Sequence, residues 1–249
     1  MGKVDAVING AVLAGVTRMI TVATDGDDAV AGRALANSNE RVFFSSGIHP
    51  LHADGEWKWE YVREAAKDAR CVAWGELGLD RHYNEPDFAL QKRLLEEHLA
   101  LIEEADSAGE QRKRPIIVHC RRAVDELLPI FAASSIEGNR FVFHCFTETP
   151  EDARKILDIG AMLSFTGVVT YKNAPEVVAS AELVPIERMM VETDAPYLPP
   201  EPVRSIRPNE PKNVMHIAAF LANLKGMDLL AFEAQVDANA EQFFSIPSL

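Results

Sequence analysis

The fold is decided by the stretch Val72-Ala73-Trp74-Gly75-Glu76-Leu77-Gly78-Leu79-Asp80. It is a short apolar run followed by turn-forming residues, which is typical of a strand buried on both faces. The run predicts that Glu76 lies at the carboxyl end of this strand. Gly75 and Gly78 flank it, and their missing side chains would let the backbone approach a ligand closely. Taken alone, the stretch fits both an ion-binding carboxylate and a carboxylate that caps the next turn.

The same pattern, an apolar run that ends in a polar tip, recurs along the chain. It predicts seven strands, near residues 20, 44, 73, 117, 142, 163 and 190, with helices between them. Connections of this length require parallel strands and right-handed crossovers. An open doubly wound sheet and a closed TIM-type (β/α)8 barrel both fit this alternation. Polar tips spread over the whole chain favour the barrel, because only a closed sheet brings distant strand ends to one rim.

One predicted helix is long and amphipathic, and it is the first helix after Asp80. It covers residues 87–108 and ends before Gly109. Its apolar face is formed by Phe88, Gln91, Leu94, Leu95, His98, Leu99 and Ile102.

Composition limits the class of protein. The chain has 249 residues, 47% of them hydrophobic, and no linker-like segment, which predicts one domain over residues 1–249. The formal charge of −13 argues against broad binding to DNA or anionic membranes, which depends on lysine and arginine. A polyanionic substrate would therefore need a local positive centre.

The cysteine count and the start of the chain bear on the compartment. Three cysteines without framework spacing suit a reducing environment. Asp5, Asn9 and Arg18 interrupt the apolar start, which does not fit a signal peptide, and no apolar run reaches the length of a membrane span. We therefore expect a cytoplasmic protein that does not bind membranes.

Four side chains at predicted strand ends form a candidate metal site. They are Glu76, His119, His144 and Asp194. A single histidine at a strand end is more often a hydrogen-bonded core residue than a ligand. Four such groups at equivalent positions favour a shared ion, and two imidazoles with two carboxylates suit zinc, manganese or magnesium.

Six short motifs match one known family. They are Gly47-Ile48-His49-Pro50, Gly75 to Asp80, Pro115 to Arg121, His144 to Thr147, Glu192 to Leu198, and Asn209-Glu210-Pro211. These motifs resemble those of the TatD-like metal-dependent nucleases, within the amidohydrolase-type barrels, and the resemblance extends from about residue 4 to the C-terminus. The family would place a strand with a His-x-His pair ahead of Val4, whereas this sequence has no histidine before His49. The resemblance thus implies a barrel whose first strand is missing or truncated.

The resemblance also implies roles for individual residues. Glu76 and Asp194 would be catalytic, with Glu76 bridging two ions and Asp194 acting as the base. His119 and His144 would complete the inner metal site. Without the His-x-His pair we expect one firmly held divalent ion, Zn, Mg or Mn, and a second that is weak or absent. Four further residues would bind substrate, namely His49, Arg121, Asn209 and Glu210, although for His49 a structural hydrogen bond fits equally well.

These roles predict metal-assisted hydrolysis of phosphodiester bonds, with a bound ion lowering the pKa of water. An acidic protein with one rim pocket suits nucleic-acid ends, so we expect an exonuclease on DNA, with RNA as a further substrate. The same site could hydrolyse an ester or amide, as in aminoacyl-tRNA deacylation. A catalytically impaired barrel that only binds metal or a partner is the third alternative. The sequence leaves the oligomeric state open, with a monomer as one option.

Overall fold

The computed structural model describes residues 2–109 and 113–247, which form two compact units. The 20–144 unit consists of Ile20–His144 with Phe243–Ile246. The 145–242 unit consists of Cys145–Gln242 with the described residues up to Met19 and Pro247. The expectation of one domain over residues 1–249 stays a prediction.

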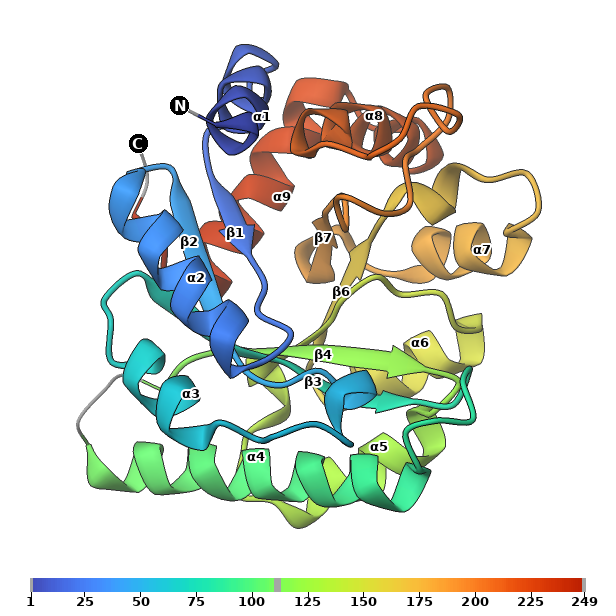
Figure 1. The fold of residues 1–249 in the computed structure, drawn as a ribbon. Coiled ribbons are helices and arrows are strands. Elements are labelled where there is room, and N and C mark those ends of the chain that lie inside the picture. Colours follow the sequence, from blue (N-terminus) through green and yellow to red (C-terminus); the bar gives the residue numbers. More distant parts are fainter. Residues whose placement is uncertain (1, 110–112, 248–249) are drawn as a thin grey trace. The chain divides into compact units, whose positions relative to one another are not determined.

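The described residues of the 20–144 unit contain a parallel sheet with its strands in chain order (Figure 1). Its strands are β1 (Met19–Thr21), β2 (Val42–Ser46), β3 (Cys71–Asp80), β4 (Ile116–Arg121) and β5 (Phe141–Phe143). The pairs β2–β3, β3–β4 and β4–β5 are all parallel, as the long connections predict. The helical segments between them are α2 (Gly26–Ser38), η1 (Pro50–His52), α3 (Trp59–Ala66), α4 (Phe88–Ala108), α5 (Val124–Ala133) and η2 (Gly138–Arg140).

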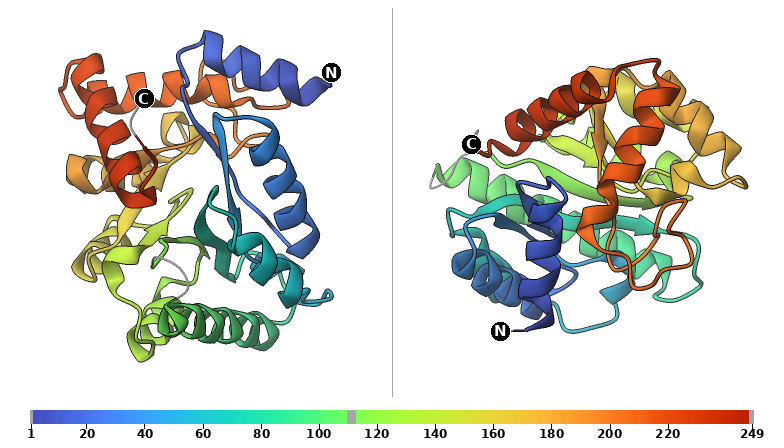
Figure 2. Two further views of the ribbon diagram at one scale, coloured as in Figure 1. Left: turned by 90° about the vertical axis from the view of Figure 1, so that its left-hand side faces the viewer. Right: turned by 90° about the horizontal axis from the view of Figure 1, so that it is seen from above.

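The 145–242 unit contains the paired parallel strands β6 (Met162–Phe165) and β7 (Met189–Val191). Its helical segments are α1 (Lys3–Leu13), α6 (Pro150–Asp158), η3 (Gly167–Thr170), α7 (Pro175–Leu183), η4 (Ile186–Arg188), η5 (Pro211–Asn213), α8 (Val214–Leu224) and most of α9 (Leu229–Phe244). Helix α1 packs against η5 from the far end of the sequence (Figures 1 and 2). Among the described residues, no single helix is long and apolar enough to cross a membrane. Only a bent pair, η5 with α8 followed by α9, meets that criterion by length and composition, with a 111° bend between its halves.

Local sequence signals explain where the helices begin. Thr149 caps α6, since its side chain accepts a hydrogen bond from the backbone N–H of Asp152 and the Asp152 carboxylate accepts in return. Asp228 caps α9 by accepting from the N–H groups of Leu230 and Ala231 at 3.0 and 3.2 Å. Both caps depend on side chains within three residues of the N–H groups that they bind.

Strand β3 is longer than the sequence predicts, and this corrects the expected position of Glu76. All ten residues of β3 are buried, and the strand continues past Glu76 to Asp80. The pairing register with β4 shifts between Trp74 and Leu77, so Glu76 lies at a bulge inside the strand rather than at its end. His119 likewise lies inside β4, whereas His144 follows the end of β5 as predicted.

The two glycines of β3 allow its backbone to pack closely on β4. A Cβ atom at Gly78 would lie 1.9 Å from the backbone oxygen of His119. A Cβ atom at Gly75 would lie 2.4 Å from the backbone oxygen of Ile117. Both glycines also have positive φ, at 149° and 116°. The close backbone approach that we expected toward a ligand is therefore made toward β4.

Candidate metal centre

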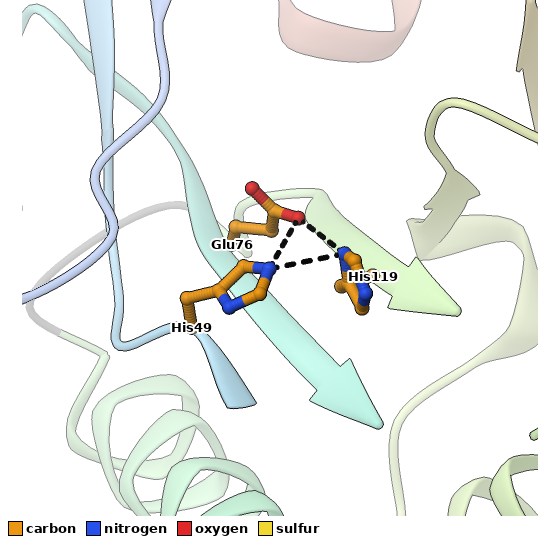
Figure 3. Close-up of side chains that lie close together, drawn as sticks. All are labelled: His49, Glu76 and His119. Carbon is orange, nitrogen blue, oxygen red and sulfur yellow. Dashed lines mark hydrogen bonds and ion pairs between the residues drawn. The ribbon is translucent and has the colours of Figure 1, made fainter. Parts of the chain in front are cut away.

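One oxygen atom of Glu76 is the centre of the site. Glu76 Oε1 lies 2.7 Å from His119 Nδ1, 2.6 Å from His144 Nε2 and 3.3 Å from His49 Nε2. Figure 3 shows the rings of His49 and His119 turned toward this carboxylate. The site thus brings together three of the four predicted metal ligands, and adds His49. All four residues belong to the 20–144 unit.

Charge inside this group is balanced by the histidines. Burial raises the pKa of Glu76. The charge of His144 and the hydrogen bonds from the surrounding imidazoles have a larger opposite effect, so the pKa lies well below its usual value. Burial also lowers the pKa of His119, yet its hydrogen bonds to Asp80 and Glu76 outweigh that effect and raise the pKa overall. The Glu76 carboxylate is therefore ionised, and its negative charge favours the protonated form of His119.

His49 is fixed by its own backbone turn. The N–H of Leu51 donates to His49 Nδ1 at 3.0 Å, where the short helix η1 begins. Because Nδ1 must keep its lone pair for this bond, neutral His49 carries its proton on Nε2. That nitrogen lies 3.1 Å from His119 Nδ1. Burial lowers the pKa of His49, against the opposing effect of Glu76. The structure thus shows a structural hydrogen bond at His49, and contact of His49 with a substrate phosphate stays a prediction.

Asp80 is a site residue that the sequence reasoning did not assign. It ends β3, is only 1% exposed, and accepts a hydrogen bond from His119 Nε2 at 3.0 Å. Its other oxygen accepts from the backbone N–H of His82 at 2.7 Å. The side chain of Gln91 accepts from the Asp80 N–H at 2.9 Å. The register of β3 and β4 is the signal that would have identified Asp80. His119 pairs with Gly78, which places Asp80 two residues further along the neighbouring strand.

His98 is a second unassigned residue, and it supports the segment that carries His49. Its ring is fully buried in α4, and its Nε2 accepts from the backbone N–H of Ile48 at 3.0 Å. Nδ1 therefore carries the proton and donates to the Leu94 carbonyl at 3.1 Å. The ring also lies edge-on to Trp59 at 4.6 Å. Burial lowers the pKa of His98 to about 4.

This pKa makes the stability of the fold depend on pH. Unfolded chains protonate His98 below about pH 6.5, whereas the folded protein does so only near pH 4, so the free energy of unfolding decreases as pH falls between these values. The expected slope from this one group is about 1.4 kcal/mol per pH unit. In His98→Gln, urea unfolding at pH 7, 6 and 5 should show a slope that is shallower by this amount.

Two further measurements complete that prediction. Glutamine can accept from Ile48 N–H, so His98→Gln should stay close to the wild type at pH 7. His98→Leu leaves the buried N–H without an acceptor and should lose about 1–3 kcal/mol of unfolding free energy at every pH. Equal slopes in the wild type and His98→Gln would contradict the assignment.

The geometry fits a metal ion. One nitrogen or oxygen atom from each of His49, Glu76 and His119 lies within 4.8 Å of the others, and His144 Nε2 lies 2.6 Å from the same Glu76 oxygen. Imidazole nitrogens and a buried carboxylate oxygen are donors that suit zinc and manganese. The 20–144 unit therefore contains a set of residues that could hold one divalent ion.

The other predicted site residues are placed as follows. Arg121 ends β4, with its guanidinium 5.6 Å from the ring centre of Tyr83. Asp194 lies in the 145–242 unit after β7, with a positive φ of 53°. Glu210, in the same unit, pairs with Lys212 at 2.7 Å.

Asn209 is buried and braces the segment around Asp194. Its side-chain nitrogen donates to the carbonyls of Thr193 and Tyr197 at 3.0 and 2.6 Å. Its side-chain oxygen accepts from the Glu210 N–H and from Asn213 at 2.9 and 2.8 Å. These four bonds use every hydrogen-bonding position of the amide. The structure shows a bracing role for Asn209, and contact with substrate stays a prediction.

Comparison with known proteins gives consistent results. The model of the TatD related DNase family matches residues 1–245. An uncharacterized metal-dependent hydrolase, YcfH of Escherichia coli K12, is 34% identical over 98% of this chain and 89% of its own length. A protein of Pantoea ananatis named 3'-5' ssDNA/RNA exonuclease TatD is 32% identical over 97% of this chain and 93% of its own.

A solved structure agrees with the sequence comparisons. The crystal structure of YjjV, a TatD homologue of Escherichia coli K12, superimposes with a TM-score of 0.89 at 26% identity. The match covers 99% of this chain and 93% of that one. This similarity confirms the predicted fold class, the TIM-type barrel of the metal-dependent hydrolases.

Proposed function

Since this chain belongs to the TatD related DNase family of metal-dependent hydrolases, we propose that it is a divalent-metal-dependent exonuclease that removes nucleotides from single-stranded DNA ends and also accepts RNA. The observation that carries this proposal is the convergence of three imidazoles on Glu76 Oε1. The relative from Pantoea ananatis supports the choice of substrate by its name. A formal charge of −13 favours chain ends in one site over long duplexes held along a surface.

Glu76, His119 and His144 would hold the ion. When bound, the ion would act as a Lewis acid and supply the positive centre that the acidic chain lacks. Asp80 accepts a hydrogen bond from the Nε2–H group of His119 and would so direct Nδ1 toward the ion, as carboxylates behind metal-bound histidines do. The backbone N–H of Leu51 donates to Nδ1 of His49, which leaves the proton of the neutral ring on Nε2. We therefore assign His49 the role of a hydrogen-bond donor through Nε2 and not that of a ligand.

The remaining predicted residues complete the proposed chemistry. Asp194 would accept the proton from the attacking water as the new P–O bond forms and the ester bond to the leaving nucleotide breaks. Asn209 would hold the Asp194 segment through the carbonyls of Thr193 and Tyr197. Arg121 would contact the substrate phosphate.

The test compares two classes of substrate. Protein stripped with chelator should be inactive, and Mn²⁺, Mg²⁺ or Zn²⁺ should restore stepwise shortening of a 5′-labelled single-stranded oligonucleotide. An aminoacyl ester assayed in parallel should stay intact. Chelator-sensitive hydrolysis of the ester without cleavage of the oligonucleotide would replace the proposal by the deacylase alternative. No turnover with any of the three ions would indicate a catalytically impaired barrel.

A further inference from the structure

The loop that follows β3 carries two adjacent aromatic rings. Tyr83 is 52% exposed, and its ring lies 4.7 Å from that of His82 at an angle of 84°. The guanidinium of Arg121 lies 5.6 Å from the centre of the Tyr83 ring. Among the residues that the structure describes, Arg121 makes no salt bridge. An exposed aromatic ring with a cation that makes no salt bridge therefore stands at the carboxyl ends of β3 and β4.

This loop is tied to the metal centre through Asp80. One oxygen of Asp80 accepts from His119, and the other accepts from the backbone N–H of His82. The Arg81 N–H donates to the Arg121 carbonyl at 2.8 Å, which joins the loop to the end of β4. Tyr83 is three residues from Asp80, so their Cα atoms are at most about 11 Å apart.

The Arg81 side chain fixes the start of the loop from the other side. Its guanidinium pairs with Glu126 at 2.9 Å and lies over the ring of Phe88 at 4.2 Å. Because both the backbone and the side chain of Arg81 are held, the loop that carries His82 and Tyr83 begins at a fixed position next to Asp80.

We propose that Tyr83 is a specificity-determining residue, on which one base of a single-stranded substrate stacks while its phosphate lies at the Glu76 site. This rests on the proposed function and names the substrate feature that the site reads. Base-to-aromatic stacking tolerates any base and selects unpaired strands, because a paired base is already stacked within its duplex. Arg121, beside the ring, would attract the adjoining phosphate and add a cation–π contribution.

The test is a cycle of protein and substrate changes. Tyr83→Ala should raise KM for a single-stranded oligonucleotide about tenfold or more, with kcat little changed, whereas Tyr83→Phe keeps the ring and should match the wild type. On an oligonucleotide whose last three nucleotides are abasic, the wild type and Tyr83→Ala should have equal KM. Tyr61→Ala is the matched control, because Tyr61 is 44% exposed and also has a cation, Lys58, 5.6 Å from its ring centre.

The outcomes separate this inference from the proposed function. If Tyr83→Ala loses the same factor on intact and abasic strands, stacking is wrong while the exonuclease stands. If the wild type cleaves no oligonucleotide, the proposed function fails. Fluorescence anisotropy with labelled intact and abasic strands then decides stacking alone, and equal affinity of wild type and Tyr83→Ala for the intact strand would overturn it.

Discussion

Replacing Glu76 by glutamine is expected to remove ion binding and hydrolysis together. A single oxygen of this carboxylate faces the rings of His119, His144 and His49. Glutamine has almost the same shape but no charge, so it can neither balance the imidazoles nor bind a cation strongly. Loss of one partner from a buried charged group costs about 3–5 kcal/mol, which corresponds to a fall of about a thousandfold in ion affinity and in kcat/KM.

Two measurements check this prediction. Isothermal titration of chelator-stripped protein with Mn²⁺ gives the affinity, and cleavage of the labelled oligonucleotide gives kcat/KM. Glu60→Gln is the matched control, because it makes the same chemical change at an exposed position of α3 and should leave both quantities unchanged. Near-normal ion affinity in a folded Glu76→Gln protein would show that the ion is held elsewhere.

Replacing Asp194 by asparagine should have a different signature. If Asp194 is the base, the variant loses about 10²- to 10⁴-fold in kcat, because asparagine cannot accept a proton from water. The ion held by the Glu76 group should still bind, since those ligands all lie in the 20–144 unit. KM for the oligonucleotide should change little.

The experiment pairs single-turnover cleavage with the same ion titration. Asp158→Asn, at an exposed position near the end of α6, provides the control in the same unit and should behave as the wild type. Equal losses of ion affinity and kcat in Asp194→Asn would make Asp194 a ligand of the firmly held ion. An unchanged kcat would exclude it as the base.

The sequence predicts much of this fold because the pattern of apolar runs is local. Each of the seven expected strands occurs, and helix starts such as Thr149 and Asp228 depend on side chains within a few residues of the cap. The motifs likewise predict that Glu76, His119 and His144 meet, because parallel strands place equivalent positions side by side. Barrel closure is inferred from the spread of those positions along the chain.

What the sequence does not predict depends on contacts between distant segments. His98 looks like one more member of the buried face of α4, and its role requires the backbone of Ile48, fifty residues away. Asp80, and not Glu76, ends β3, because the strand continues through a bulge at Glu76. That bulge is a feature of the pairing between β3 and β4. No pattern within β3 alone reveals that register shift.

The packing of Gly78 against the His119 carbonyl has a consequence for metal selectivity. The backbones of β3 and β4 are in direct contact at this point. The distance between Glu76 and His119 is therefore set by main-chain geometry. The His144 backbone is held as well, since its N–H donates to the Val118 carbonyl of β4 at 3.1 Å. Selectivity for ionic radius would thus depend on the main chain that carries these three residues, and a change in preferred cation would be sought first around Gly78.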